Sequence, residues 1–97
     1  MALSGKHRNY LRGLAHHRRP VVMLGAAGVT PAVVSELDAA LAHHELVKVR
    51  LPAADRDVRR RCVADLCSRT GAERVQEIGH VAVLYRPAAR PRITLPA

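Results

Sequence analysis

Apolar residues recur at helical spacing in three stretches of the chain, and each stretch carries signals for where a helix begins or ends. The stretches run from Leu3 to His17, from Thr30-Pro31 to His43-His44, and from Asp55 to Gly71. The expected N-caps are Ser4, Thr30 and Asp55, and Gly71 is the expected stop. In the first helix the apolar stripe includes Tyr10, and Gly13 indicates a close approach to another element.

Four shorter runs predict strands. Val21–Leu24 is continuously apolar, as expected of a strand that is buried on both faces. Leu46–Leu51 alternates between apolar and basic residues, so one face should be buried and the other cationic. Val75–Ile78 and Val81–Arg86 flank Gly79-His80, a two-residue connection typical of a hairpin.

The elements follow the order α-β-α-β-α-β-β. Two βαβ units favour parallel pairing with right-handed crossovers, and the hairpin adds an antiparallel partner. We therefore predict an α/β fold in which helices pack on a four-stranded mixed sheet. The 97 residues are enough for a single domain, 1–97. Residues 87–97 contain three prolines and little periodicity, so they should form an extended tail.

Composition narrows the class of protein. The two cysteines, Cys62 and Cys67, are too few for a disulfide framework, lack the spacing of a zinc site and should be core thiols. Residues 1–19 contain no apolar signal segment, and the uncharged stretch 20–35 contains two glycines and two prolines. We expect a cytoplasmic protein without a membrane span, metal or cofactor, and we expect it to be a monomer.

Net charge is concentrated at the two ends of the chain. Sixteen Lys and Arg residues against eight Asp and Glu residues give a formal net charge of +8. Residues 1–35 and 78–97 carry all of this excess, because residues 36–77 hold the eight acids and eight cations. If the fold brings the ends together, they form one basic face for a polyanion. The alternative is a soluble protein that is merely basic.

The turn between the first predicted strand and the second helix is Gly25-Ala26-Ala27-Gly28. Its glycines permit positive φ and close approach, and the helix that follows Thr30 directs N–H groups toward it. Such GxxG loops hold nucleic-acid backbones in KH modules, although two glycines also fit ordinary turn chemistry. The turn lacks the Gly-Lys-Ser/Thr of a P-loop and the third glycine of a dinucleotide site. Its flanking segments carry only positive charge, so nucleic acid is the favoured ligand.

Aromatic content restricts how RNA can be bound. Trp and Phe are absent and Tyr is found twice, so bases cannot stack extensively on aromatic side chains. Recognition of backbone and shape is expected instead, which indicates structured RNA and a steep salt dependence. The predicted contacts are the loop residues Gly25, Ala26, Ala27 and Gly28 and six cations, Lys6, Arg12, Arg18, Arg19, Lys48 and Arg50.

Several basic groups also have a simpler interpretation. Lys48 and Arg50 could form a solvated strand face, and the run His16–Arg19 could stabilise the end of the first helix. His43-His44 fits capping or packing better than metal ligation.

Other residues are assigned structural roles. Arg59-Arg60-Arg61 is expected to pair with the acids of its own helix, while Tyr85 should be core and Arg86 at the surface. The acids, histidines and serines form no recognisable catalytic arrangement, so no enzyme is expected. The glycine turn joins a strand to a helix, which differs from the two joined helices of a helix-turn-helix DNA-binding regulator.

Six runs of the sequence together resemble one family. They are Gly13-Leu14-Ala15-His16, Pro20-Val21-Val22, Leu24–Thr30, Leu41–Val49, Ile78-Gly79 and Val83–Pro87. The combination resembles the bacterial YhbY family, the single-domain form of the CRM (chloroplast RNA splicing and ribosome maturation) domain. The resemblance spans nearly the whole chain.

The resemblance implies an RNA-binding domain similar in topology to the C-terminal domain of translation initiation factor three. It further implies a large (50S) subunit ribosome assembly factor whose partner is ribosomal RNA or a pre-ribosomal particle. Plant relatives carry the domain in group II intron splicing factors, so an RNA chaperone or an intron- or small-RNA-binding module is the alternative. The family's GxxG loop maps onto Gly25 to Gly28, where Ala26 and Ala27 stand in place of a frequent polar residue.

Overall fold

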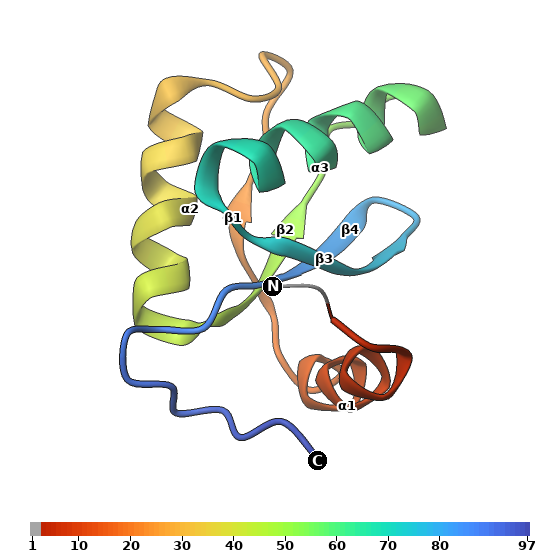
Figure 1. The fold of residues 1–97 in the computed structure, drawn as a ribbon. Helices are drawn as coiled ribbons and strands as arrows, with labels where there is room; N and C mark the ends of the chain where they lie inside the picture. Colours follow the sequence, from red (N-terminus) through yellow and green to blue (C-terminus); the bar gives the residue numbers. More distant parts are fainter. Residues whose placement is uncertain (1–2) are drawn as a thin grey trace.

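The computed structural model describes residues 3–97, which form three helices and four strands (Figure 1). In chain order these are α1 (Gly5–Ala15), β1 (Pro20–Met23), α2 (Pro31–His44), β2 (Leu46–Arg50), α3 (Arg56–Thr70), β3 (Glu73–Ile78) and β4 (Val81–Tyr85). The predicted order and the α/β class are confirmed. The boundaries differ by two residues at each end of α1, which was expected to run from Leu3 to His17, and at the start of β3, which begins at Glu73 and not at Val75.

The predicted caps determine where the helices begin and end. The side chains of Ser4, Thr30 and Asp55 accept the N–H of the third residue of their helices, at 3.1, 3.2 and 2.9 Å. Each bond satisfies one of the N–H groups that a helix start leaves without a partner. Gly71 ends α3 in the left-handed conformation, with φ +75°, which only glycine adopts without steric cost.

The four strands form one mixed sheet in the order β1-β2-β4-β3. β1 pairs with β2 in parallel, whereas β4 lies between β2 and β3 and is antiparallel to both. The second βαβ unit therefore joins two parallel strands that are not neighbours. The hairpin strand β4 fills the gap between them.

Helices cover both faces of the sheet and produce two hydrophobic cores (Figure 1). On one face, α2 and α3 pack through Leu37, Leu41 and Leu66 against alternate residues of the strands, such as Val49. On the other face, α1 packs through Leu11 and Ala15. Each fully buried leucine contributes about 1.5–3 kcal/mol of transfer free energy. The predicted alternation of β2 is confirmed, because Val47 and Val49 are buried while Lys48 and Arg50 lie on the opposite face.

Three expectations about packing are wrong. β1 is an edge strand with one open face, since Val21 is 49% and Met23 61% exposed. Tyr10 is 40% exposed and lies outside the α1 stripe. A Cβ at Gly13 would meet no other atom of residues 3–97 within 4 Å, so Gly13 marks no close approach. The open face of β1 follows from the position of α1, which packs mainly on β2 and β3.

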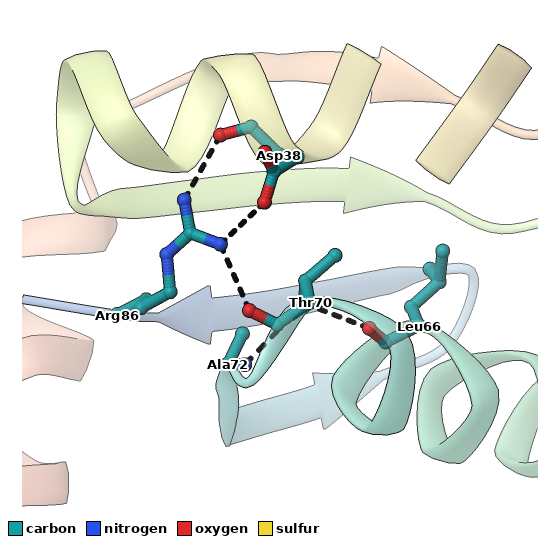
Figure 2. Close-up of polar contacts among 5 residues, drawn as sticks. All are labelled: Asp38, Leu66, Thr70, Ala72 and Arg86. Carbon is teal, nitrogen blue, oxygen red and sulfur yellow. Dashed lines mark hydrogen bonds and ion pairs between the residues drawn. The ribbon is translucent and has the colours of Figure 1, made fainter. Parts of the chain in front are cut away.

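Arg86, which was expected at the surface, is partly buried and links several elements (Figure 2). Its Nη1 donates to Asp38 Oδ1 at 2.6 Å and to the Thr70 carbonyl at 2.8 Å. Its Nη2 donates to the Asp38 carbonyl at 3.0 Å. The side chain thereby joins the end of β4 to α2 and to the end of α3. The prediction that Tyr85 is core is confirmed.

Candidate nucleic-acid interface

The glycine turn leaves the sheet where β1 ends. Leu24 N–H donates to the Arg50 carbonyl at 2.9 Å, which holds the start of the turn against β2. Gly28 N–H then donates to the Gly25 carbonyl at 3.0 Å, and Gly28 adopts φ +69°. Ala26 and Ala27, at the tip of the turn, are exposed. The residues between the glycines are therefore the part of the loop that a ligand can approach.

The structure changes which N–H groups the loop can offer. The amide of Gly28 was expected to face a ligand, but it closes the turn. In the first turn of α2, Pro31 has no N–H and Val33 donates to Thr30 Oγ1. Within residues 3–97, the N–H groups of Ala26 and Ala27 have no protein acceptor and remain available. The exposed N–H groups at the tip of the turn are therefore available to an anion.

A cleft of about 900 Å³ lies between this loop and the start of α3, and we refer to it as the glycine-loop cleft. Loop residues form one wall, and the segment 51–54 with α3 forms the other. Three basic residues line it, Arg50, Arg61 and His80. Its acid, Asp65, is paired with Arg69 at 2.8 Å, so the acid's charge is largely compensated. The cleft therefore presents backbone donors and net positive charge to an anion.

Arg61 and His80 were missed by sequence reasoning. Within residues 3–97, none of Arg59 to Arg61 forms the predicted ion pair with an acid of α3. Arg59 instead donates to the Ala54 carbonyl, and Arg61 faces the cleft. Arg61 follows Val58, a residue of the apolar stripe of α3, by three positions. This spacing places Arg61 beside the stripe, and it is the sequence signal that could have identified Arg61. The hairpin brings His80 to the cleft, and the His80 carbonyl accepts Leu51 N–H at 2.6 Å.

A row of four residues crosses the open part of the sheet beside the cleft. The strand register aligns Met23, Arg50, Val81 and Ile78 in that order from β1 to β3. Met23 and Ile78 are 61% and 65% exposed, which is unusual for such large apolar side chains. Arg50 therefore stands in an apolar row, next to the glycine loop.

The other predicted cations lie elsewhere. Arg12 and Lys48 border a groove between α1 and the sheet, and Lys48 is also reached from a pocket that contains Arg18 and Arg19. Lys6 lies apart from them, because its Nζ donates to the Ala97 carbonyl at 2.5 Å. The fold does bring the two ends of the chain together, as the sequence interpretation required. It distributes the cations over several hollows of the surface.

Glu45 is the most consequential residue that the sequence did not single out. It caps α2 at φ +64° and is fully buried. Oε2 accepts Ala88 N–H at 2.9 Å, and Oε1 accepts the N–H groups of Arg92 and Ile93 at 2.9 and 3.1 Å. Burial raises the pKa of Glu45, but these three hydrogen bonds and the Arg92 charge outweigh it and lower the pKa overall. One carboxylate therefore anchors the tail.

The tail then crosses to α1, as its course in Figure 1 shows. Ile93 and Leu95 pack on the second core, and the Pro96 carbonyl lies 2.9 Å from His7 Nε2. The predicted extended tail thus contacts both the end of α2 and α1.

The cysteines have the expected character. Cys62 is buried and Cys67 is half-buried, and both are free thiols. Burial raises the pKa of the Cys67 thiol, which disfavours the reactive thiolate. Among residues 3–97 no cluster of three His, Cys, Asp or Glu side chains could hold a metal ion, and no helix is both long and apolar enough to cross a membrane.

Comparison with known proteins supports the resemblance noted from the sequence. The family model of the CRS1 / YhbY (CRM) domain matches residues 3–86. A protein of Haemophilus influenzae named RNA-binding protein is 48% identical over 94 residues, which cover 97% of this chain and 95% of the relative. A Pseudomonas aeruginosa protein with a similar name is 38% identical over 95 residues, covering 98% and 91% of the two chains.

The solved structures agree with this assignment. The solution structure of a hypothetical protein from Staphylococcus aureus matches with a TM-score of 0.85 and 33% identity. The match covers 98% of this chain and 100% of the other. In fold and in sequence, the chain belongs to the CRS1/YhbY family of CRM domains.

Proposed function

We propose that this protein binds structured RNA through the glycine-loop cleft and acts as an assembly factor for the large ribosomal subunit in the cytoplasm. The observation that carries the RNA-binding proposal is the loop itself. At its tip, the N–H groups of Ala26 and Ala27 have no acceptor within residues 3–97, and Arg50, Arg61 and His80 line the same cleft. Backbone donors and cations recognise phosphate whatever the base sequence. The names of the relatives support RNA as the partner.

In this proposal the protein acts as a monomeric binding factor and not as a catalyst. Several acids already have structural partners. Asp38 is paired with Arg86, Asp65 with Arg69, and Glu45 with the tail. These contacts occupy the three carboxylates, which therefore stabilise the fold. The cations of the cleft face solvent and contact the RNA.

The loop is tested by placing negative charge at its tip. The double variant Ala26→Asp/Ala27→Asp should fold normally, because both positions are exposed, and should lose RNA affinity by roughly 100-fold through repulsion of phosphate. The matched control, Ala26→Ser/Ala27→Ser, changes the same positions without charge and should keep most of the affinity. Binding of a ribosomal RNA fragment by a folded aspartate variant at wild-type strength would remove the loop from the proposal.

The ribosomal role is tested separately, by sedimentation of a native lysate at low salt with this protein followed by antibody. Migration with large-subunit or precursor particles, and release from them at high salt, is the expected result. Confinement to the light fractions would remove the ribosome from the proposal. It would favour an RNA chaperone or a module for introns or small RNAs.

A further inference from the structure

A second basic pocket lies at the opposite end of β1 and β2 from the glycine-loop cleft, and we refer to it as the tail-side pocket. Its volume is about 560 Å³. The segment before β1, the end of α2, β2 and the tail all contribute to its walls. Six of its lining side chains are basic, namely Arg18, Arg19, His43, His44, Lys48 and Arg92.

The acid that lines this pocket does not neutralise it. Glu45 is fully buried, and both of its carboxylate oxygens accept N–H groups of the tail. Arg92 is the nearest cation, with Nε 3.7 Å from Glu45 Oε1. The remaining basic groups have no acid in the pocket to pair with. A surplus of positive charge in a hollow of this size favours an anion.

Two arginines of the pocket are already held in place. Arg18 Nη1 donates to the Leu46 carbonyl at 2.9 Å, and Arg92 Nη2 donates to the His43 carbonyl. A guanidinium has five N–H donors, so each arginine keeps others for a ligand. Neither side chain needs to lose much conformational freedom when an anion binds, which makes this a preorganised site.

The histidines show that the cations are crowded. The rings of His43 and His44 lie 4.5 Å apart, edge to face. Burial, and then the charges of His43, Arg18 and Arg92, lower the pKa of His44. Arg19 and Lys48 add positive charge from the other walls, and Glu45 adds the negative charge described above. A bound anion would favour the protonated rings, so its binding should take up protons.

We propose that the tail-side pocket is a second phosphate-binding site, in which His43 and His44 contact a backbone phosphate of the bound RNA more strongly at low pH. The choice of RNA as the source of the phosphate rests on the proposed function. Arg19 and Gly25 flank β1 and are at most about 20 Å apart, the length of six extended residues. A single folded RNA can therefore contact both sites.

The first experiment uses inorganic phosphate alone and follows the ring protons of the histidines by NMR as pH is varied. Phosphate should raise the titration midpoints of His43 and His44 and leave that of His80, which lies at the other end of the sheet, unchanged. Equal shifts at every histidine, or no shift at His43 and His44, would overturn the proposal.

The second experiment measures affinity for a ribosomal RNA hairpin at pH 6 and pH 8. The variant His43→Gln/His44→Gln should weaken binding about tenfold at pH 6, where charge-assisted hydrogen bonds are lost, and little at pH 8. Arg60→Gln, on the exposed side of α3, is the control and should bind like the wild type. Arg19→Gln should weaken binding at both pH values, because arginine stays charged throughout this range.

The outcomes separate this proposal from the proposed function. The pocket proposal is supported if phosphate shifts the titration of His43 and His44 and if the double histidine variant loses the pH dependence of RNA affinity. Identical pH dependence in the wild type and the double histidine variant would overturn the RNA contact. Phosphate shifts in a protein that binds no RNA would refute the proposed function. They would leave a site for free phosphate or a nucleotide.

Discussion

The glycine-loop cleft and the tail-side pocket both gather basic groups at an end of the sheet, but they are built differently. The cleft depends on a turn of four consecutive residues, placed between β1 and a capped helix. The pocket depends on residues from four segments that meet once Glu45 has bound the tail. The backbone donors of the cleft are local in the sequence, although its cations Arg50, Arg61 and His80 come from β2, α3 and the hairpin, whereas the pocket also needs the tail. Because no tail residue lines the cleft, the cleft should survive loss of the tail, whereas the pocket should fail with it.

The largest expected effect concerns both regions together. If about six phosphates are neutralised, RNA affinity should fall roughly 10³-fold or more between 50 and 200 mM salt. Arg50→Gln in the cleft and Arg19→Gln in the pocket should each reduce the slope of log affinity against log salt by about one. Filter binding across the salt series provides the measurement. A flat response would contradict the electrostatic account of both regions.

Glu45→Gln should separate the two regions most clearly. The amide presents N–H donors to the tail N–H groups, so the free energy of unfolding should fall by about 3 kcal/mol. Urea denaturation measures the loss. Relative to the wild type, hydrogen exchange in the variant should accelerate more at the Ala88 and Ile93 amides than at the Gly28 amide. Protection of the tail amides that equals the wild type would contradict the anchoring role.

The same carboxylate gives the wild type a pH dependence. The pKa of Glu45 is lower in the fold than its ordinary value of about 4.3, so its contribution to stability is complete above that value. It is lost as pH falls through the lowered pKa of the folded state. Urea denaturation between pH 5 and pH 2 should show this loss in the wild type. The Glu45→Gln variant should lack this loss of stability at low pH.

Arg61→Gln tests the cleft alone. Its guanidinium lines the cleft without an acidic partner among residues 3–97, so its removal should weaken RNA binding about tenfold and leave stability nearly unchanged. Arg60→Gln removes the same charge from the neighbouring, exposed position. Equal losses of affinity in the two variants would indicate a general charge effect instead of a contact in the cleft.

The smallest expected effect is on stability, and it comes from substituting alanine for the glycines of the loop. Gly28→Ala should lower the free energy of unfolding by about 1 kcal/mol, because φ is +69° at this position. Gly25→Ala is the matched control, since its Cβ would enter open space and its φ is ordinary. Thermal denaturation of both variants tests the difference. Equal stability of the two alanine variants would show that the turn does not depend on Gly28.

Local patterns predicted the elements well, and long-range contacts account for the failures. The caps at Ser4, Thr30 and Asp55 are confirmed because a cap bond joins residues three apart. The double burial expected of β1 is wrong because position in the sheet decides exposure, and β1 is an edge strand. Arg61 was assigned to an ion pair because the acids of its helix are near in sequence, whereas its side chain faces the cleft.

By itself, the sequence determined the order of helices and strands, the mixed α/β class and the glycine loop. All of these depend on hydrogen bonds and side-chain periodicity within a few residues. The tertiary structure decided that β4 lies between β2 and β3, that Arg86 links three elements and that Glu45 holds the tail. Glu45 and Arg92 are 47 positions apart in the chain, and their contact exists because burial of the two cores brings the end of α2 and the tail together. No local periodicity encodes such a contact.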